Sequence, residues 1–178
     1  MTISPPTVSD LRDSIRNVSD FPKLGIQFKD ITPVLADPRL FAGCIELLIA
    51  GFKPGQVDTV VGIDARGFIF AAAAAMRLNA GFVPVRKKGK LPYDTHEQSY
   101  DLEYGSNTIA IHTDAVKPGS RVLLIDDLLA TGGTAEAAAI LLQKVGANIL
   151  EAAFFIELKD LRGRERIQHC PVRSLVVY

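Results

Sequence analysis

Short apolar runs alternate along this chain with longer segments of helical periodicity. Short β-branched runs are typical of buried strands, and they lie at Asp58–Ile63, Gly81–Val85, Arg121–Ile125, Ile149–Ile156 and Arg173–Val177. The segments Gly67–Asn79 and Ala135–Lys144 predict helices, and Gly146 is placed to close the second. Strands that alternate with helices predict an α/β fold whose central sheet is mostly parallel and flanked by helices.

Two further helices are expected before the first of these strands. Ser9–Val18 can form a short helix. Asp37 followed by Pro38 is a typical helix start, with the carboxylate as N-cap and proline at the first helical position, and this helix should continue through Ile49.

The middle of the chain breaks the alternation of strands and helices. Thr108–His112 alternates between apolar and polar residues and predicts one arm of an antiparallel hairpin with Tyr100–Glu103. The segment Lys87–Tyr100 is a long polar stretch, which predicts a loop. Loops of that length in a compact domain are usually functional or mobile.

Composition bounds the class of protein. A chain of 178 residues without repeats or a low-complexity linker predicts one domain over residues 1–178. Twenty basic residues balance twenty acidic ones, so no overall charge favours nucleic acid. The N-terminus lacks an apolar leader, and the longest uncharged apolar run, Gly67–Met76, is too short to cross a bilayer. Together with Cys44 and Cys170, interpreted as reduced thiols, these features predict a cytoplasmic protein without a membrane partner.

The segment Val122–Thr134 carries the most specific chemistry. An apolar strand leads to two adjacent acids, Asp126 and Asp127, where the strand is expected to end. A small-residue loop and a helix follow, and a helix N-terminus presents backbone N–H groups and the positive end of its dipole to an anion. This predicts a phosphate cradle of backbone N–H groups and two threonine hydroxyls, formed by Ala130, Thr131, Gly132, Gly133 and Thr134. A carboxylate pair beside it suits sugar hydroxyls, a metal, or both, whereas an isolated pair would more often be a helix-capping turn.

A second loop and a basic cluster are weaker signals. Gly62–Gly67 has the glycine spacing of a nucleotide-binding P-loop, but Phe68 and Ile69 stand where that loop requires lysine and a hydroxyl residue, so a P-loop is rejected. What remains is a strand-to-helix loop with Arg66 at the helix start, or an ordinary turn with a solvated arginine. The cluster Arg86–Lys90 is either a solvated surface loop or a set of cations that serves the phosphate sites.

Four stretches together resemble the type I phosphoribosyltransferases. Val122–Thr134 is similar to the family's motif for 5-phosphoribosyl-1-pyrophosphate (PRPP). The resemblance to the family's adenine-using members rests on Phe21–Pro33, on Gly62–Phe68, and on Val85–Pro92 followed by Ser99–Gly105. It runs from about Phe21 to the C-terminus. It implies the fold of that family, with a small N-terminal base-binding hood, residues 1–34, and a flexible loop.

The resemblance also implies an activity. It is transfer of the phosphoribosyl group of PRPP to adenine, which gives AMP and pyrophosphate in purine salvage. Mg²⁺ would be the cofactor, held through PRPP rather than by direct protein ligands, with Asp126 or Asp127 contacting it through water. The chain would act as a homodimer on small-molecule substrates, without nucleic acid.

Roles for individual residues follow from the resemblance alone. Asp126 and Asp127 would hold the ribose hydroxyls, and the cradle would hold the 5-phosphate. Pyrophosphate would meet Asp64, Ala65 and Arg66, across a cis peptide between Asp64 and Ala65. Ala65 replaces a hydroxyl residue common in some relatives. Further PRPP contacts would come from the basic cluster, namely Arg86, Lys87 and Lys90, with Arg86 and Lys87 reaching across a dimer interface.

The base site and the proton transfer are implied in the same way. Backbone groups of Ile26 and Gln27 would bind the edge of adenine, while Phe28 would stack on it. Lys29 stands where many relatives carry arginine. The catalytic residues would be Arg66 and Glu103, the latter meeting the purine near N7, with Tyr104 linked to loop closure.

Two alternatives stay open from the residues themselves. A PRPP-sensing regulator would need a nucleic-acid-binding patch or a further domain, and no such element is visible in the sequence. A transferase for hypoxanthine, xanthine or orotate would share the motif around Asp126, so the choice of adenine depends on Phe21–Pro33 and on the loop that carries Glu103.

Overall fold

The computed structural model describes residues 4–101 and 106–178, which form two compact units divided between Leu47 and Leu48. The first unit contains helix α1 (Val8–Ser14), strands β1 (Arg16–Ser19) and β2 (Gln27–Asp30), helix α2 (Thr32–Ala36), and all of helix α3 (Pro38–Leu48) except its last residue. The antiparallel β1–β2 ribbon pairs Val18 with Phe28. The first unit therefore holds the whole segment expected to bind the base.

The helix predicted at Ser9–Val18 is too long. It ends at Ser14 because Ile15 is extended, and the chain turns directly into β1. The start of α3 is as predicted, since Asp37 Oδ1 accepts hydrogen bonds from the backbone N–H groups of Arg39 (2.8 Å) and Leu40 (3.0 Å).

The second unit is built on a seven-stranded sheet with the order β5-β6-β4-β3-β7-β8-β9. The five strands from β4 to β9 in that order are parallel, while β6 and β5 add an antiparallel hairpin. Their bounds are β3 (Thr59–Ile63), β4 (Gly81–Lys87), β5 (Thr95–Asp101), β6 (Ser106–His112), β7 (Arg121–Leu129), β8 (Asn148–Glu157) and β9 (Val172–Val177). The mixed, mostly parallel sheet confirms the predicted fold class.

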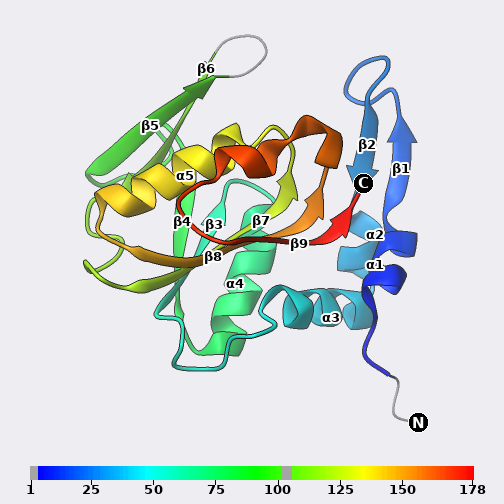
Figure 1. Cartoon of the computed structure of the whole chain (residues 1–178), viewed down its shortest axis with the longest axis horizontal. Coiled ribbons are helices and arrows are strands. Elements are labelled where there is room, and N and C mark those ends of the chain that lie inside the picture. The colour runs from blue at the N-terminus through cyan, green and yellow to red at the C-terminus, as the bar shows by residue number, and fades with distance from the viewer. Residues whose placement is uncertain (1–3, 102–105) are drawn as a thin grey trace. The chain divides into compact units, whose positions relative to one another are not determined.

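Helices α4 (Gly67–Leu78) and α5 (Gly133–Lys144) lie on opposite sides of this sheet (Figure 1). Successive side chains of a strand point to opposite faces of the sheet. Since a helix covers each face, the side chains on both faces are apolar. In β8, Phe154 belongs to the core beneath α5, whereas the ring of its neighbour Phe155 lies 5.6 Å from that of Phe70 on α4. Two short 3₁₀ turns, η1 (Lys159–Leu161) and η2 (Gly163–Arg166), follow β8. None of the helices in the described ranges is long and apolar enough to span a bilayer.

The long loop predicted at Lys87–Tyr100 is wrong, because half of this segment is strand. Strand β4 continues to Lys87, and β5 begins at Thr95 and pairs with β6 along its whole length. The half-buried face of β5 carries His96, Gln98 and Tyr100. Since two of these three side chains are polar, the alternation of apolar and polar residues that normally reveals a strand is missing here.

Candidate active site

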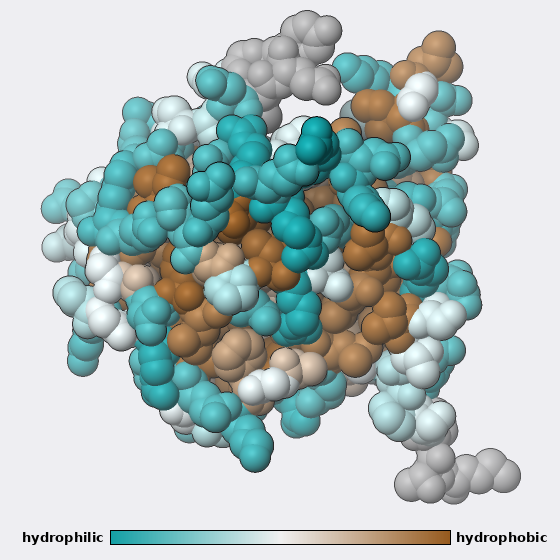
Figure 2. Space-filling view, in the orientation of Figure 1, coloured by the Kyte–Doolittle hydropathy of each residue, from teal (hydrophilic) through white to brown (hydrophobic). Residues whose placement is uncertain are grey.

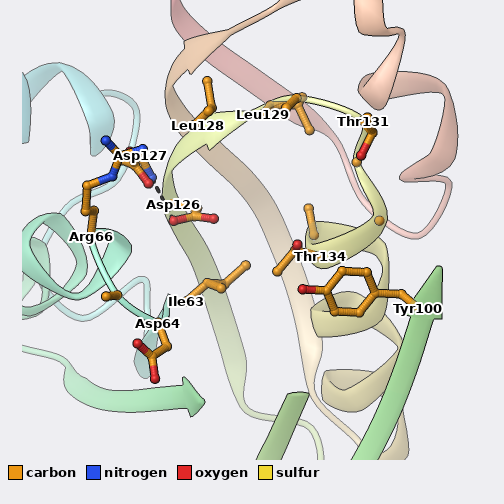
Figure 3. Close-up of a pocket in the computed structure, with 15 residues that line it drawn as sticks. Ile63, Asp64, Arg66, Tyr100, Asp126, Asp127, Leu128, Leu129, Thr131 and Thr134 are labelled. Carbon is orange, nitrogen blue, oxygen red and sulfur yellow. Dashed lines mark hydrogen bonds and ion pairs between the residues drawn. The ribbon is translucent and has the colours of Figure 1, made fainter. Parts of the chain in front are cut away.

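Two strand-to-helix loops meet at one edge of the sheet. Strands β3 and β7 are parallel neighbours, with Gly62 opposite Ile125, so the loops that follow them lie side by side. They enclose a cavity of about 350 Å³ (Figure 3). Its lining consists of Ile63, Asp64, Ala65, Arg66, Tyr100, Asp126, Asp127, Leu128, Leu129, Ala130, Thr131, Gly132, Gly133, Thr134 and Ala135. The structure thus brings together the acid pair, the cradle and the second loop.

The two acids lie within β7 and not at its end. The strand continues to Leu129 because its pairing with β8 extends to Glu157. Asp127 is buried, and its Oδ2 atom lies 2.7 Å from an Nη atom of Arg66. Asp126 Oδ1 accepts a hydrogen bond of 2.9 Å from the backbone N–H of Asp127. The expectation that β7 ends before the acids was wrong, because the strand carries both acids within the sheet.

Burial raises the pKa of both carboxyl groups above their usual range. The negative charge of Asp127 raises the pKa of Asp126 further, whereas the Arg66 guanidinium opposes the increase at Asp127. A ligand that brings hydroxyl donors or positive charge to this pair would relieve the cost of their ionised forms.

The cradle starts α5 without a side-chain cap among the described residues, so its first backbone N–H groups can serve an anion. Gly132 has φ +83°, a conformation that favours glycine. A Cβ atom here would also run into the backbone of Gly163, within 2.9 Å of its Cα. The structure therefore gives this glycine a reason that the sequence did not suggest, which is close packing of the cradle against η2.

The second loop joins β3 to α4 and contains a cis peptide between Asp64 and Ala65, as predicted. Arg66 precedes the first residue of α4. The next residue, Gly67, lies so close to β7 that a Cβ atom would come within 2.5 Å of Asp126 Oδ1. This glycine allows α4 to start directly beside the acid pair, which brings Arg66 to Asp127.

Residues 30–177 match the family described as phosphoribosyl transferase domain. Adenine phosphoribosyltransferase of Parvibaculum lavamentivorans is 54% identical over 93% of this chain and 95% of its own length. The chain belongs to the adenine phosphoribosyltransferase family. The crystal structure of the Rhodothermus marinus adenine phosphoribosyltransferase is 52% identical, with a TM-score of 0.91 over 96% of this chain and 98% of that one. The enzyme of Saccharomyces cerevisiae, solved with an imino-altritol bisphosphate and adenine, is 38% identical, with a TM-score of 0.87 over 94% and 97% of the two chains.

The basic cluster of this adenine phosphoribosyltransferase family member does not line the cavity. The Arg86 Nε atom lies 3.3 Å from Asp64 Oδ2, and one Nη atom donates to the carbonyl of Lys90 at 3.0 Å. The side chains of Lys87 and Lys90 are exposed. Within this chain, Arg86 therefore supports the second loop through Asp64.

The predicted base-binding residues lie in the first unit. The ring of Phe28 packs edge-on against that of Phe21 at 5.1 Å, and the side chain of Gln27 bonds to that of Ser19 across the ribbon. Lys29 Nζ donates to Asn17 Oδ1 at 2.6 Å. Ile26 precedes β2 and is partly exposed. Glu103 and Tyr104 lie outside the described residues, so their roles stay predictions.

Five lining residues were missed from the sequence. Four of them, Ile63, Leu128, Leu129 and Ala135, are apolar and differ in no visible way from core residues. Tyr100 is the fifth. Its position on the half-buried face of β5 could have indicated it, but the polar residues of that strand kept the strand itself from being predicted.

The side chains around the cavity can be compared with the ligands that the expected magnesium ion needs. The described residues contain no group of three or more His, Cys, Asp or Glu side chains that could hold a metal. The acid pair fits a cation whose other ligands come from the substrate, since Mg²⁺ is usually bound by one or two carboxylates together with phosphates and water.

Proposed function

We propose that this protein transfers the phosphoribosyl group of PRPP to adenine and releases AMP and pyrophosphate. The observation that carries the proposal is that an acid pair, a helix N-terminus and an arginine-bearing loop line one cavity. Their chemistry matches the ribose, the 5-phosphate and the pyrophosphate of PRPP. The choice of adenine is supported by family membership and by the adenine bound in the yeast relative.

The 5-phosphate would bind at the start of α5. The backbone N–H groups of Gly132, Gly133 and Thr134 supply donors, and the hydroxyl groups of Thr131 and Thr134 add two more. The ribose hydroxyls would donate to Asp126 and Asp127, which are acceptors when ionised. These contacts would place the anomeric carbon between the two loops, so that positioning would supply a large part of the rate.

The pyrophosphate group would bind at the second loop, beside Asp64, Ala65 and Arg66. Arg66 carries a guanidinium group that can stay at Asp127 while it faces the departing anion. Charge builds up on pyrophosphate as the bond to the anomeric carbon breaks. We therefore assign Arg66 a catalytic role in stabilising the leaving group.

The base would be held by the backbone at Ile26 and Gln27 and by the ring of Phe28. Glu103 would exchange a proton or a hydrogen bond near N7 while N9 attacks the sugar, and Tyr104 would take part in closing the loop. Mg²⁺ bound through PRPP, with water-mediated contact to Asp126 or Asp127, would neutralise charge on the pyrophosphate. A cytoplasmic location also stays a prediction.

A homodimer is part of the proposal. On the second unit, several large apolar side chains stay exposed between hydrophilic ones, including Ile69 and Met76 on α4 and Phe82 on β4. Such exposure favours burial against another chain. Figure 2 shows one face of the molecule, on which apolar side chains likewise reach the surface between hydrophilic ones. The same strand β4 carries Arg86, which a dimer could present to the neighbouring site.

The decisive experiment offers the purified protein PRPP and Mg²⁺ together with adenine, hypoxanthine, guanine or orotate in turn. AMP formation with adenine, and little product from the other bases, is the expected result. Turnover of a different base would contradict the choice of adenine. Failure to bind PRPP at all would contradict the assignment of the cavity.

A further inference from the structure

Tyr100 is a lining residue for which the proposed function has no role. It lies near the end of β5, on the strand face that also carries Gln98. Lys144, in the last turn of α5, donates to Gln98 Oε1 at 2.8 Å and to the carbonyl of Glu97 at 3.2 Å. Because side chains two residues apart in a strand share a face, this contact orients Tyr100 toward α5 as well.

The ring of Tyr100 lies against the first residue of α5. A Cβ atom on Gly133 would be 3.1 Å from Tyr100 Cδ2 and 3.6 Å from the carbonyl oxygen of Asp101. The ring is half-buried and packs on the core beneath this helix. Figure 3 shows the hydroxyl end of Tyr100 pointing toward Thr134 within the cavity. The phenol is thus held in place by β5 on one side and by the start of α5 on the other.

The distribution of charge around the cradle indicates a role for this hydroxyl group. Within the described part of the chain, Arg66 is the one cationic side chain that lines the cavity, and it is paired with Asp127. Arg166, which lies near Gly133, is paired with Glu136 at 2.9 Å. A phosphate at the cradle would therefore depend on neutral donors, and each further O–H group would matter.

We infer that Tyr100 is a third hydroxyl donor to the phosphate group in the cradle, supplied by the β5–β6 hairpin. This inference rests on the proposed function, because the phosphate is the 5-phosphate of PRPP. It makes the cradle a composite of two elements: α5 supplies backbone N–H groups and threonine hydroxyls, and β5 supplies a phenol. Removal of the hydroxyl should weaken the binding of ligands that carry the 5-phosphate and leave the binding of pyrophosphate unchanged.

The test uses Tyr100→Phe, which removes the hydroxyl and keeps the ring on Gly133. Calorimetry with ribose 5-phosphate should give binding about tenfold weaker or more than for the unmodified protein, as expected for a lost hydrogen bond to a charged group. Pyrophosphate should bind the two proteins equally. The matched control is Ser99→Ala, which removes a hydroxyl from the opposite face of the same strand, where it lies 2.9 Å from Thr108 Oγ1. This control should bind ribose 5-phosphate normally.

Equal ribose 5-phosphate affinity for Tyr100→Phe and the unmodified protein would overturn the inference while leaving the proposed function intact. An equal loss of affinity for ribose 5-phosphate and pyrophosphate would also overturn the inference, because such a loss would indicate a general change in the cavity. If the unmodified protein bound neither PRPP nor ribose 5-phosphate, the proposed function itself would fall, and this inference with it.

Discussion

At the scale of single residues, the acid pair lowers the stability of the folded protein while it provides the charge that the site needs. Asp126 and Asp127 occupy a strand between buried apolar residues, and burial raises the pKa of each carboxyl group. In the folded protein without ligand, ionisation of the pair is therefore less favourable than ionisation of exposed carboxyl groups. The cost is consistent with a site whose negative charge is needed only when a sugar or a cation arrives.

This conflict predicts a pH-dependent gain in stability for Asp126→Asn. An asparagine can keep the hydrogen bond from the Asp127 N–H and carries no charge. Because the folded-state pKa of Asp126 is raised, the folded protein binds more protons than the unfolded chain between the two pKa values, and its stability falls as the pH rises through that window. The variant should therefore melt higher than the unmodified protein at pH 7. A gain of about 1 kcal/mol would raise Tm by about 2–4 °C.

The gain should shrink as the pH falls toward 3.8, the usual pKa of an aspartate, and vanish below it, where the acid is protonated in both states. PRPP turnover by the variant should be lost at neutral pH. Asp58→Asn is the control of opposite sign, since hydrogen bonds from Arg121 hold the pKa of Asp58 at about 2. That variant should lose stability at pH 7. Thermal melts of the three proteins from pH 4 to pH 8 check the prediction, and a lower Tm for Asp126→Asn at pH 7 would contradict it.

At the scale of elements, the cradle depends on a turn far away in sequence. Gly163 begins η2, and a Cβ atom there would collide with the carbonyl oxygen of Ala130 and lie 2.8 Å from the backbone nitrogen of Gly132. Arg166 in the same turn bonds to Glu136 in the first turn of α5. The turn therefore supports both the loop and the helix start that form the cradle.

Gly163→Ala should weaken PRPP binding although Gly163 does not line the cavity. The added methyl group must push η2 and the loop at Ala130 apart, and overpacking of this kind typically costs about 1–3 kcal/mol of stability. Gly81→Ala is the matched control, because its Cβ atom would meet only ordinary contacts at 3.6 and 3.8 Å. Urea unfolding together with PRPP calorimetry measures both effects. Unchanged PRPP affinity in Gly163→Ala would show that the turn does not control the cradle.

The same elements show what the sequence could predict. The strands β3 and β7, the helices α4 and α5, and the two loops between them follow from apolar periodicity and helix signals, because these local rules agree there with the fold. Strand β5 was missed because its half-buried face is polar. Gly163 was missed because its constraint is a contact with Gly132, 31 residues earlier in the chain, and no local pattern reports such a contact.

At the scale of the whole molecule, the role of Arg86 decides whether the active site is formed by one chain or by two. Within one chain, Arg86 lies beside Asp64 and outside the cavity lining. The resemblance to the family instead implies that Arg86 serves the partner's site. Both arrangements predict that Arg86→Ala loses activity, so a single variant cannot distinguish them.

A mixing experiment can distinguish them. Asp127→Asn should be inactive because Asp127 acts in its own subunit, and Arg86→Ala should be inactive for either reason. If Arg86 acts across the interface, a mixed dimer contains one site with both an intact Asp127 and an intact Arg86. Random exchange of subunits in a symmetric dimer makes half of the dimers mixed, so activity should return to about a quarter of the unmodified level. Sedimentation must show dimers that exchange, and Asp127→Asn mixed with Asp126→Asn is the control that stays inactive. No recovery in exchanged dimers would place Arg86 in the site of its own chain, where its contact with Asp64 would be its function.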